Sequence, residues 1–301
     1  MPRASRRLRR ISAFATAALV VAALAACSPE DENTTSNSPT TSGSGGETSA
    51  AADPCAVENL PLRTAGQLTI ATNSPAYPPW FKGNDPSNGK GFEGAVAYAV
   101  AHQMGFSDDQ VKWVVEPFGK SFAPGDKDFD FDINQISILP SREKAVDFSE
   151  GYFEVTQGVV ALKDSGLQLG SLDDLRQARL GAEQGTTSLL AAEAIDPSTQ
   201  VAVFPDTNAA KQALQNGQID AVVADLDTAL YISAVEIPGS EVVGQFATTG
   251  GEPEQFGLLL EKGSPLLDCV NQALDVLHSN GTLKRFEARW LAKSADIPVL
   301  Q

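Results

Sequence analysis

The chain has 301 residues, of which 22 are basic and 38 acidic, giving a formal net charge of −16 at pH 7. Five of the arginines lie within residues 1–10, so the remainder carries 17 basic against 38 acidic residues, a charge of −21. So acidic a chain argues against a nucleic-acid-binding function. Its length suits one large or two medium domains with a substantial core.

Residues 1–26 have the pattern of a secretory signal peptide, with an arginine-rich start followed by an apolar run at 11–26. That run is too short and wrongly flanked for a membrane span. Its end, "LAAC" at 24–27, resembles a bacterial lipobox, in which Cys27 is acylated and becomes the new N-terminus. The alternative is an ordinary signal peptide with a neighbouring cysteine. We predict a lipid-anchored protein on the extracytoplasmic face of the cell membrane.

Residues 28–52 contain no large apolar side chain and therefore predict a flexible tether. We assign 27–58 to the lipidated cysteine and this linker. If Cys27 is acylated, two cysteines remain, Cys55 and Cys269. In an exported protein an even remainder favours a disulfide, which would tie the two ends of the chain together. Two unpaired buried thiols are the alternative.

Beyond the linker, apolar patterns typical of strands and helices alternate. Strands are predicted at 67–72, 111–117, 129–135, 158–164, 179–184, 201–205 and 218–225. Helices are predicted at 92–105, after Ser171, and at 186–194, 208–217, 264–281 and 282–291, with Ser264 as N-cap and Pro265 as the first helical residue. This alternation implies an α/β protein with mostly parallel sheet.

In open α/β sheets, ligands bind beyond the carboxyl ends of the strands. The predicted strand ends and the segments after them supply the candidate binding residues, which are Ser74, Tyr77, Trp80, Phe118, Asn134, Gln135, Ser137, Arg142, Thr186, Thr187, Ser188 and Asp225.

The chemistry of these residues suits an α-amino acid. The guanidinium of Arg142 can hold a carboxylate through two hydrogen bonds. A helix that starts at Thr186 and Thr187 offers backbone N–H groups to the same anion. Asp225 can accept from an ammonium group, and the three aromatic side chains can enclose what lies between.

Each residue also has a structural alternative. Arg142 lies in the charged segment "SREK", which could face water, and Asp225 could cap the following helix. The threonine pair could be only a helix start, and Tyr77 and the other aromatics could belong to the core. The joint occurrence of all these groups at strand ends favours a binding site.

Signals for catalysis or cofactors are weak. The chain has no P-loop, no dinucleotide fingerprint and no Cys/His spacing for zinc, and neither histidine lies beside a nucleophile motif. Asp128, Asp130 and Asp132 lack the features of a calcium loop and are expected to line a solvated strand edge. We therefore predict no catalytic residues, no cofactor and no metal site.

The chain resembles the family 3 solute-binding proteins of amino-acid ABC importers. The segments that carry this resemblance are "LTIATNSPAYPPW", "GKGFEGAVAYAVA", "FDFDINQISILPSREKAVDFSEGYF", "SLDDLRQARLGAEQGTTS", "QALQNGQIDAVVAD" and "LLDCVNQALDVLHSNGTLKRFEARWL". The resemblance implies a two-lobed fold of the type II periplasmic-binding-protein kind, in which each lobe is a mostly parallel sheet flanked by helices. It places one lobe at 59–154 and 256–295 and the other at 155–255.

The resemblance also implies roles for individual residues. It assigns Arg142, Thr186 and Thr187 to the ligand α-carboxylate, Asp225 to the α-ammonium, and Ser137 to the ligand backbone. Tyr77 and Trp80 match the family's aromatic positions.

Two departures bear on specificity. Ser74 stands where relatives often have Asp, and Asn134 with Gln135 replaces a pair of small residues. These departures leave the side-chain specificity open and argue against a lysine or arginine ligand.

The predicted function is capture of a polar L-amino acid by a monomeric binding protein that delivers it to a membrane permease. An enzyme on the same fold, such as a cyclohexadienyl dehydratase, and a sensory subunit are the alternatives.

Overall fold

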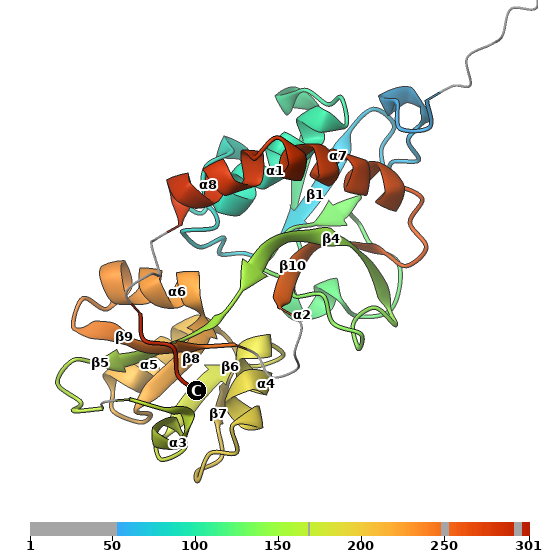
Figure 1. Cartoon of the computed structure of the whole chain (residues 1–301). Helices are drawn as coiled ribbons and strands as arrows, with labels where there is room; N and C mark the ends of the chain where they lie inside the picture. Colours follow the sequence, from blue (N-terminus) through green and yellow to red (C-terminus); the bar gives the residue numbers. More distant parts are fainter. Residues whose placement is uncertain (1–52, 168, 248–252, 292–296) are drawn as a thin grey trace, which may run out of the picture. The chain divides into compact units, whose positions relative to one another are not determined.

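The structure is a computed structural model that describes residues 53–167, 169–247, 253–291 and 297–301 (Figure 1). The predicted signal peptide, Cys27 and nearly all of the predicted linker lie outside these residues, so those assignments stay predictions. Within the described residues, no helix is long and apolar enough to cross a membrane.

The first sheet has five strands in the order β2-β1-β3-β10-β4. Its strands are β1 (Leu68–Thr72), β2 (Val111–Val115), β3 (Phe131–Asp132), β4 (Val146–Val155) and β10 (Glu254–Glu261). β2 and β3 run parallel to β1, whereas β10 runs antiparallel to both β3 and β4.

Three helices cover one face of the first sheet, α1 (Phe92–Gln103), α7 (Leu267–Ser279) and α8 (Thr282–Trp290) (Figure 1). Their apolar residues and the strand residues Ile70 and Phe131 form one buried cluster. The short helix α2 (Phe118–Ser121) follows β2, and a smaller cluster around Phe129 holds its Phe118. Three 3-10 turns lie in the loops, η1 (Val57–Asn59), η2 (Pro86–Asn88) and η3 (Asp108–Gln110).

The second sheet has the order β7-β6-β8-β5-β9. Its strands are β5 (Gln157–Leu162), β6 (Leu180–Glu183), β7 (Ala202–Phe204), β8 (Ala221–Asp225) and β9 (Ser240–Phe246). β7 and β8 run parallel to β6, whereas β5 runs antiparallel to β8 and β9.

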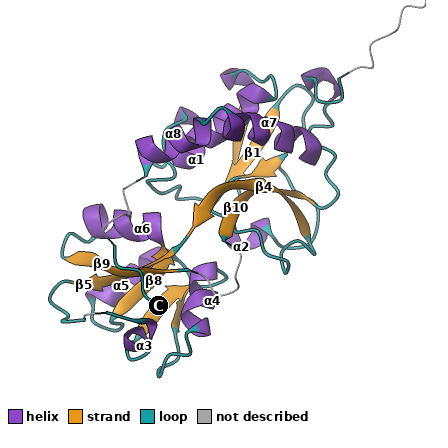
Figure 2. Ribbon diagram, in the orientation of Figure 1, coloured by secondary structure: helices purple, strands orange, loops and turns teal. Residues whose placement is uncertain are grey.

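Helices pack on both faces of the second sheet (Figure 2). They are α3 (Leu172–Leu175), α4 (Thr187–Ala194), α5 (Thr207–Gln215), α6 (Leu226–Tyr231) and the π-helical η4 (Ile232–Glu236). Val159 belongs to the cluster that contains residues of α4, and its neighbour Val160 to the cluster that contains residues of α5 and α6. This alternation is typical of a strand that is buried on both faces.

The chain passes between the two sheets at paired strands. β4 ends at Val155 and β5 begins at Gln157, so one residue separates the two sheets there. On the return, β10 begins at Glu254, which lies opposite Val155 in the β4–β10 ladder. The last residues also contact the second sheet, because Val299 forms a β-bridge with Gln245 of β9 and Leu300 is buried in that sheet's core.

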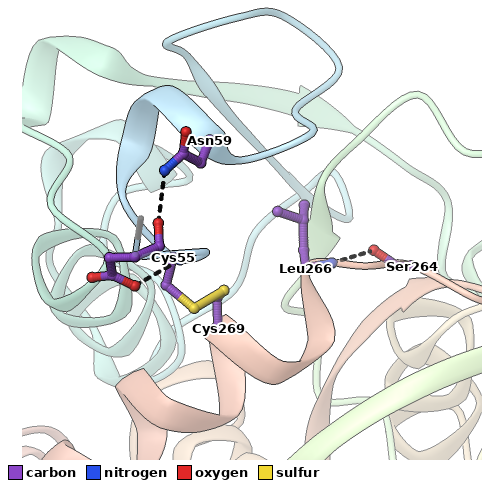
Figure 3. Close-up of a disulfide and its surroundings, with 6 residues drawn as sticks. Cys55, Asn59, Ser264, Leu266 and Cys269 are labelled. Atoms are coloured by element: carbon purple, nitrogen blue, oxygen red, sulfur yellow. Dashed lines mark hydrogen bonds between the residues drawn. A yellow bond between two sulfur atoms is a disulfide. The ribbon is translucent and has the colours of Figure 1, made fainter. Parts of the chain in front are cut away.

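A disulfide joins Cys55 to Cys269, with their Cα atoms 5.4 Å apart (Figure 3). Cys55 precedes η1, and Cys269 lies in the first turn of α7. Near Cys55, the amide of Asn59 donates to the carbonyl of Asp53. The bond therefore fixes the start of the folded part to a C-terminal helix across 214 residues.

Several expectations about the fold were wrong. Both sheets are mixed rather than mostly parallel, because β4, β9 and β10 were not recognised as strands and bring antiparallel pairings. The predicted strand 129–135 contains only β3, since Gln135 takes a left-handed conformation with φ 48°. Helix α7 starts at Leu267 because Ser264 lies in a preceding turn, where its hydroxyl accepts from the N–H of Leu266.

The solvated edge expected for Asp128, Asp130 and Asp132 was wrong for the last two, whereas Asp128 is exposed. Asp130 and Asp132 are only 3% and 0% exposed. Asp130 accepts from the backbone N–H groups of Arg63 and Thr69, and the hydroxyl of Ser121 donates to Asp132. These carboxyls therefore belong to the interior of the first sheet instead of a solvated edge.

Candidate functional site

A cleft of about 610 Å³ is lined by residues from both sheets and their loops. All twelve residues proposed from the sequence line it. The structure therefore brings the residues chosen at the predicted strand ends into one cleft. The cleft also contains residues that the sequence did not single out, among them Phe122, Glu183, Asp206, Lys211 and Glu236.

Arg142 is a buried cation at this cleft, with only 6% of its surface exposed. Its Nη1 donates to the carbonyl of Ser137 at 2.8 Å and its Nη2 to the carbonyl of Gly185 at 3.0 Å. The guanidinium carbon lies 4.4 Å from the ring centroid of Phe122 and 5.6 Å from that of Phe118. Burial lowers the pKa of Arg142 to about 10, which leaves it charged at neutral pH. The alternative in which Arg142 faces water is therefore wrong.

The start of α4 forms part of the opposite wall. Thr186 is the N-cap, and its hydroxyl accepts from the N–H of Leu189 and donates to the carbonyl of Glu183. Its side chain is therefore occupied by capping, as the structural alternative proposed. Thr187 is buried, and its hydroxyl lies 3.4 Å from that of Ser137. Ser188 is also buried beside it.

Asp225 ends β8 and makes no side-chain hydrogen bond that caps α6, so the capping alternative is wrong. Its carboxyl accepts from the side-chain amide of Gln157 at 3.1 Å. Burial, followed by the charge of Glu254, raises the pKa of Asp225 to about 8. At neutral pH and without a ligand, Asp225 is therefore predominantly protonated.

The predicted aromatic residues divide between wall and core. Tyr77 is half-buried, and its hydroxyl accepts from the amide of Asn208. Burial raises the pKa of Tyr77, and nearby carboxylates, Asp206 foremost among them, raise it further. Trp80 is 1% exposed within the core of the first sheet, and its indole N–H donates to the hydroxyl of Thr228 at 2.9 Å. Trp80 therefore packs chiefly as a core residue whose edge reaches the cleft.

The floor of the cleft contains polar atoms without partners. Among the described residues, the Nδ2 of Asn134 and the hydroxyl of Thr72 are buried and have no hydrogen-bond partner. Gln135 is held by the buried carboxyl of Glu93, which accepts from both its backbone and its side-chain amide. Ser74 is exposed at the rim. Buried polar groups of this kind are ordinarily satisfied by water or by a ligand.

The charged residues that line the cleft have an acidic balance. Two are basic and four are acidic, namely Arg142, Lys211, Glu183, Asp206, Asp225 and Glu236. Lys211 is paired with Glu236 at 2.8 Å. Glu183 accepts from the hydroxyl of Thr207, and Asp206 caps α5. The cleft thus carries carboxylates even though Ser74 supplies none. The absence of an acid at position 74 is therefore not a reason to exclude a ligand with a basic side chain.

Two mixed sheets with flanking helices, joined by paired crossing strands and sharing a cleft, define a two-lobed binding protein of the type II periplasmic class. The chain belongs to the bacterial extracellular solute-binding proteins, family 3, whose model matches residues 68–293.

Curated and solved relatives agree with this assignment. The L-cystine-binding protein TcyJ of Escherichia coli K12 is 28% identical over 241 residues, which span 78% of this chain and 86% of TcyJ. An ancestral arginine-binding protein bound to arginine is 32% identical, with a TM-score of 0.61 over 75% of this chain and 99% of that one. The ancestral amino acid-binding protein AncCDT-1, a precursor of cyclohexadienyl dehydratase, is 27% identical, with a TM-score of 0.61 over 75% of this chain and 96% of that one. The homologues are thus amino-acid-binding proteins of ABC importers.

Proposed function

We propose that this protein is the substrate-binding subunit of an ABC importer and captures an L-amino acid with a polar side chain for delivery to a membrane permease. The observation that carries the proposal is the presence, in one cleft, of the buried guanidinium of Arg142 and the carboxyl of Asp225. A zwitterionic head group offers the complementary charges. Relatives named for cystine and arginine are consistent with an amino-acid ligand.

The two groups assign an orientation to the bound amino acid. Its α-carboxylate accepts from Arg142 and from the start of α4 at Thr187, where the helix N-terminus favours an anion. Its α-ammonium donates to Asp225 and Ser137. The side chain then extends toward Tyr77 and the floor of the cleft.

Closure of two lobes follows from the same contacts. We assign residues 59–154 and 256–295 to one lobe and 155–255 to the other. Arg142 and Ser137 belong to the first, and Thr187 and Asp225 to the second. Because the ligand engages both sets only when the lobes are closed, its differential affinity for the closed form drives closure.

The remaining assignments concern how the protein is attached to the membrane. We propose that a lipid on Cys27 holds a monomer at the extracytoplasmic face of the membrane, with residues 28–52 as a tether. The "LAAC" segment and the family's extracellular location support this arrangement.

An enzyme of the cyclohexadienyl dehydratase type is the second candidate. A protonated carboxyl in the cleft favours it, because expelling a leaving group requires a general acid. AncCDT-1 connects this fold to that enzyme as a precursor, but is itself named an amino acid-binding protein. Binding without turnover is the expected behaviour here, since the close homologues are transport binding proteins.

A thermal-shift screen against the twenty L-amino acids tests the proposal. A compound that binds only the native state raises the unfolding midpoint in a concentration-dependent way. We expect one amino acid, or a small group of related ones, to do so. A folded protein that responds to none of the twenty would overturn the proposed function, and conversion of a bound cyclohexadienyl compound would favour the enzyme.

A further inference from the structure

A cluster of hydrogen-bond acceptors lies where the chain passes between the two sheets. Gln157 is the first residue of β5 and is 0% exposed, and Glu254 is the first residue of β10 and is 9% exposed. Gln157 lies opposite Asp225 in the β5–β8 ladder. Neither Gln157 nor Glu254 was proposed from the sequence.

The cluster has more acceptors than donors. The amide nitrogen of Gln157 donates to Asp225 at 3.1 Å and to Glu254 at 3.3 Å, and the hydroxyl of Ser137 donates to the other oxygen of Glu254 at 2.5 Å. The amide oxygen of Gln157 is buried and has no partner among the described residues. When Asp225 and Glu254 are both ionised, two carboxylates and one amide oxygen therefore share a single amide and a single hydroxyl.

Among the described residues no salt bridge involves Asp225 or Glu254, and the only charge that favours their ionised forms is the longer-range one of Arg142. A buried carboxylate without a cation is costly, so the empty cluster is a poor arrangement for the protein alone. The raised pKa of Asp225 reflects this cost. An ammonium group supplies both missing elements, a positive charge and three N–H donors.

We infer that Gln157 and Glu254, which lie behind the cleft-lining Asp225 and Ser137 and are hydrogen-bonded to them, complete the ammonium site of the cleft. The bound ammonium donates to Asp225 and to the free amide oxygen of Gln157. Glu254 supplies a second negative charge and is a positioning residue that holds Ser137 and Gln157 in place. This inference rests on the proposed function and deepens it, because the cluster then selects compounds with an amino group over otherwise identical acids.

A purely structural role makes a different prediction. Glu254 accepts hydrogen bonds from Ser137 and from Gln157. In a purely structural role it would only hold these two side chains, and with them the shape of the cleft, in place. Its loss would then weaken every compound that binds there, whether or not that compound carries an amino group. An ammonium site loses affinity only for compounds that carry one.

The test compares two probes on wild-type protein and on Glu254→Gln. The probes are the L-amino acid that gives the largest midpoint shift among the twenty and the same compound with hydrogen in place of the amino group. We expect Glu254→Gln to weaken the amino acid about tenfold or more and to change the affinity for the des-amino acid less than about twofold. Isothermal titration at one pH and ionic strength supplies both dissociation constants.

Two further variants make the result decisive. Glu154→Gln makes the same chemical change at an exposed residue of β4 that does not line the cleft, and it should bind both probes like the wild type. Gln157→Met removes the free amide oxygen without removing a carboxyl, and it should also lose affinity for the amino acid alone. It serves as the test if Glu254→Gln does not fold.

Each outcome bears on a separate claim. Equal losses for both probes, or no loss for either, would overturn the ammonium site and leave the proposed function standing. A wild-type protein that binds none of the twenty amino acids would overturn the proposed function and this inference together.

Discussion

Replacing Arg142 is the perturbation with the largest predicted effect on binding. Its guanidinium is 6% exposed and donates to two backbone carbonyls, so it is held in a low-dielectric position where a ligand carboxylate can reach it. Removing one partner of such a buried charge pair costs about 3–5 kcal/mol because the other charge is left uncompensated. For Arg142→Ala this corresponds to a dissociation constant raised about 150- to 5,000-fold.

Arg142→Lys separates charge from shape. The ammonium of lysine retains the positive charge but loses the planar fork that holds a carboxylate through two hydrogen bonds. We expect its affinity to lie between those of the wild type and Arg142→Ala. Arg289→Ala, which removes an exposed arginine of α8, is the matched control and should bind normally.

Isothermal titration with the amino acid identified by the screen measures these constants. The thermal midpoint of each ligand-free variant is recorded alongside, so that a loss of affinity is not confused with unfolding. If Arg142→Ala bound within about threefold of the wild type, the carboxylate would not be held by Arg142, and the proposed orientation of the ligand would be wrong.

Three further results are expected. In the ligand-free protein Asp225 has a pKa of about 8, and binding of an ammonium group requires its ionised form. The affinity for the amino acid should therefore rise between pH 6 and 8 and then level off, and a pH-independent affinity in calorimetry would contradict this. Because the cleft lining has four acidic and two basic residues, basic amino acids should bind more tightly than glutamate in competition titrations, and the reverse order would refute the charge argument. Replacing Cys55 and Cys269 by serine should lower the free energy of unfolding by about 2–5 kcal/mol, given the long loop that the disulfide closes, and should leave affinity unchanged. Denaturant titration measures this free energy of unfolding, and identical midpoints for the wild type and the double serine variant would contradict the expected loss.

Much of the α/β framework was predictable because its strands and helices carry strong local patterns. β1 and α1 lie within one or two residues of their predicted bounds. The positions of the crossing strands β4 and β10 were not predicted because their pattern is interrupted, with register shifts around Gly257. These two strands make the first sheet mixed, whereas the second sheet is mixed because β5 runs antiparallel to β8 and β9.

The lining of the cleft was predictable to the extent that the cleft is built from strand ends. Arg142 and Asp225 both follow predicted strands, and both line the cleft. Gln157 and Glu254 were missed because they lie at the beginning of strands, and only the pairing of the crossing strands brings them to Asp225. No local sequence signal reports such a pairing.

The most direct test of the central claim is a crystal structure of the protein with the amino acid that the screen identifies. We expect the α-carboxylate to contact the guanidinium of Arg142 and the α-ammonium to contact Asp225, with the side chain directed toward Tyr77. A ligand bound with its head group reversed, or bound outside this cleft, would show that the proposed binding mode is wrong.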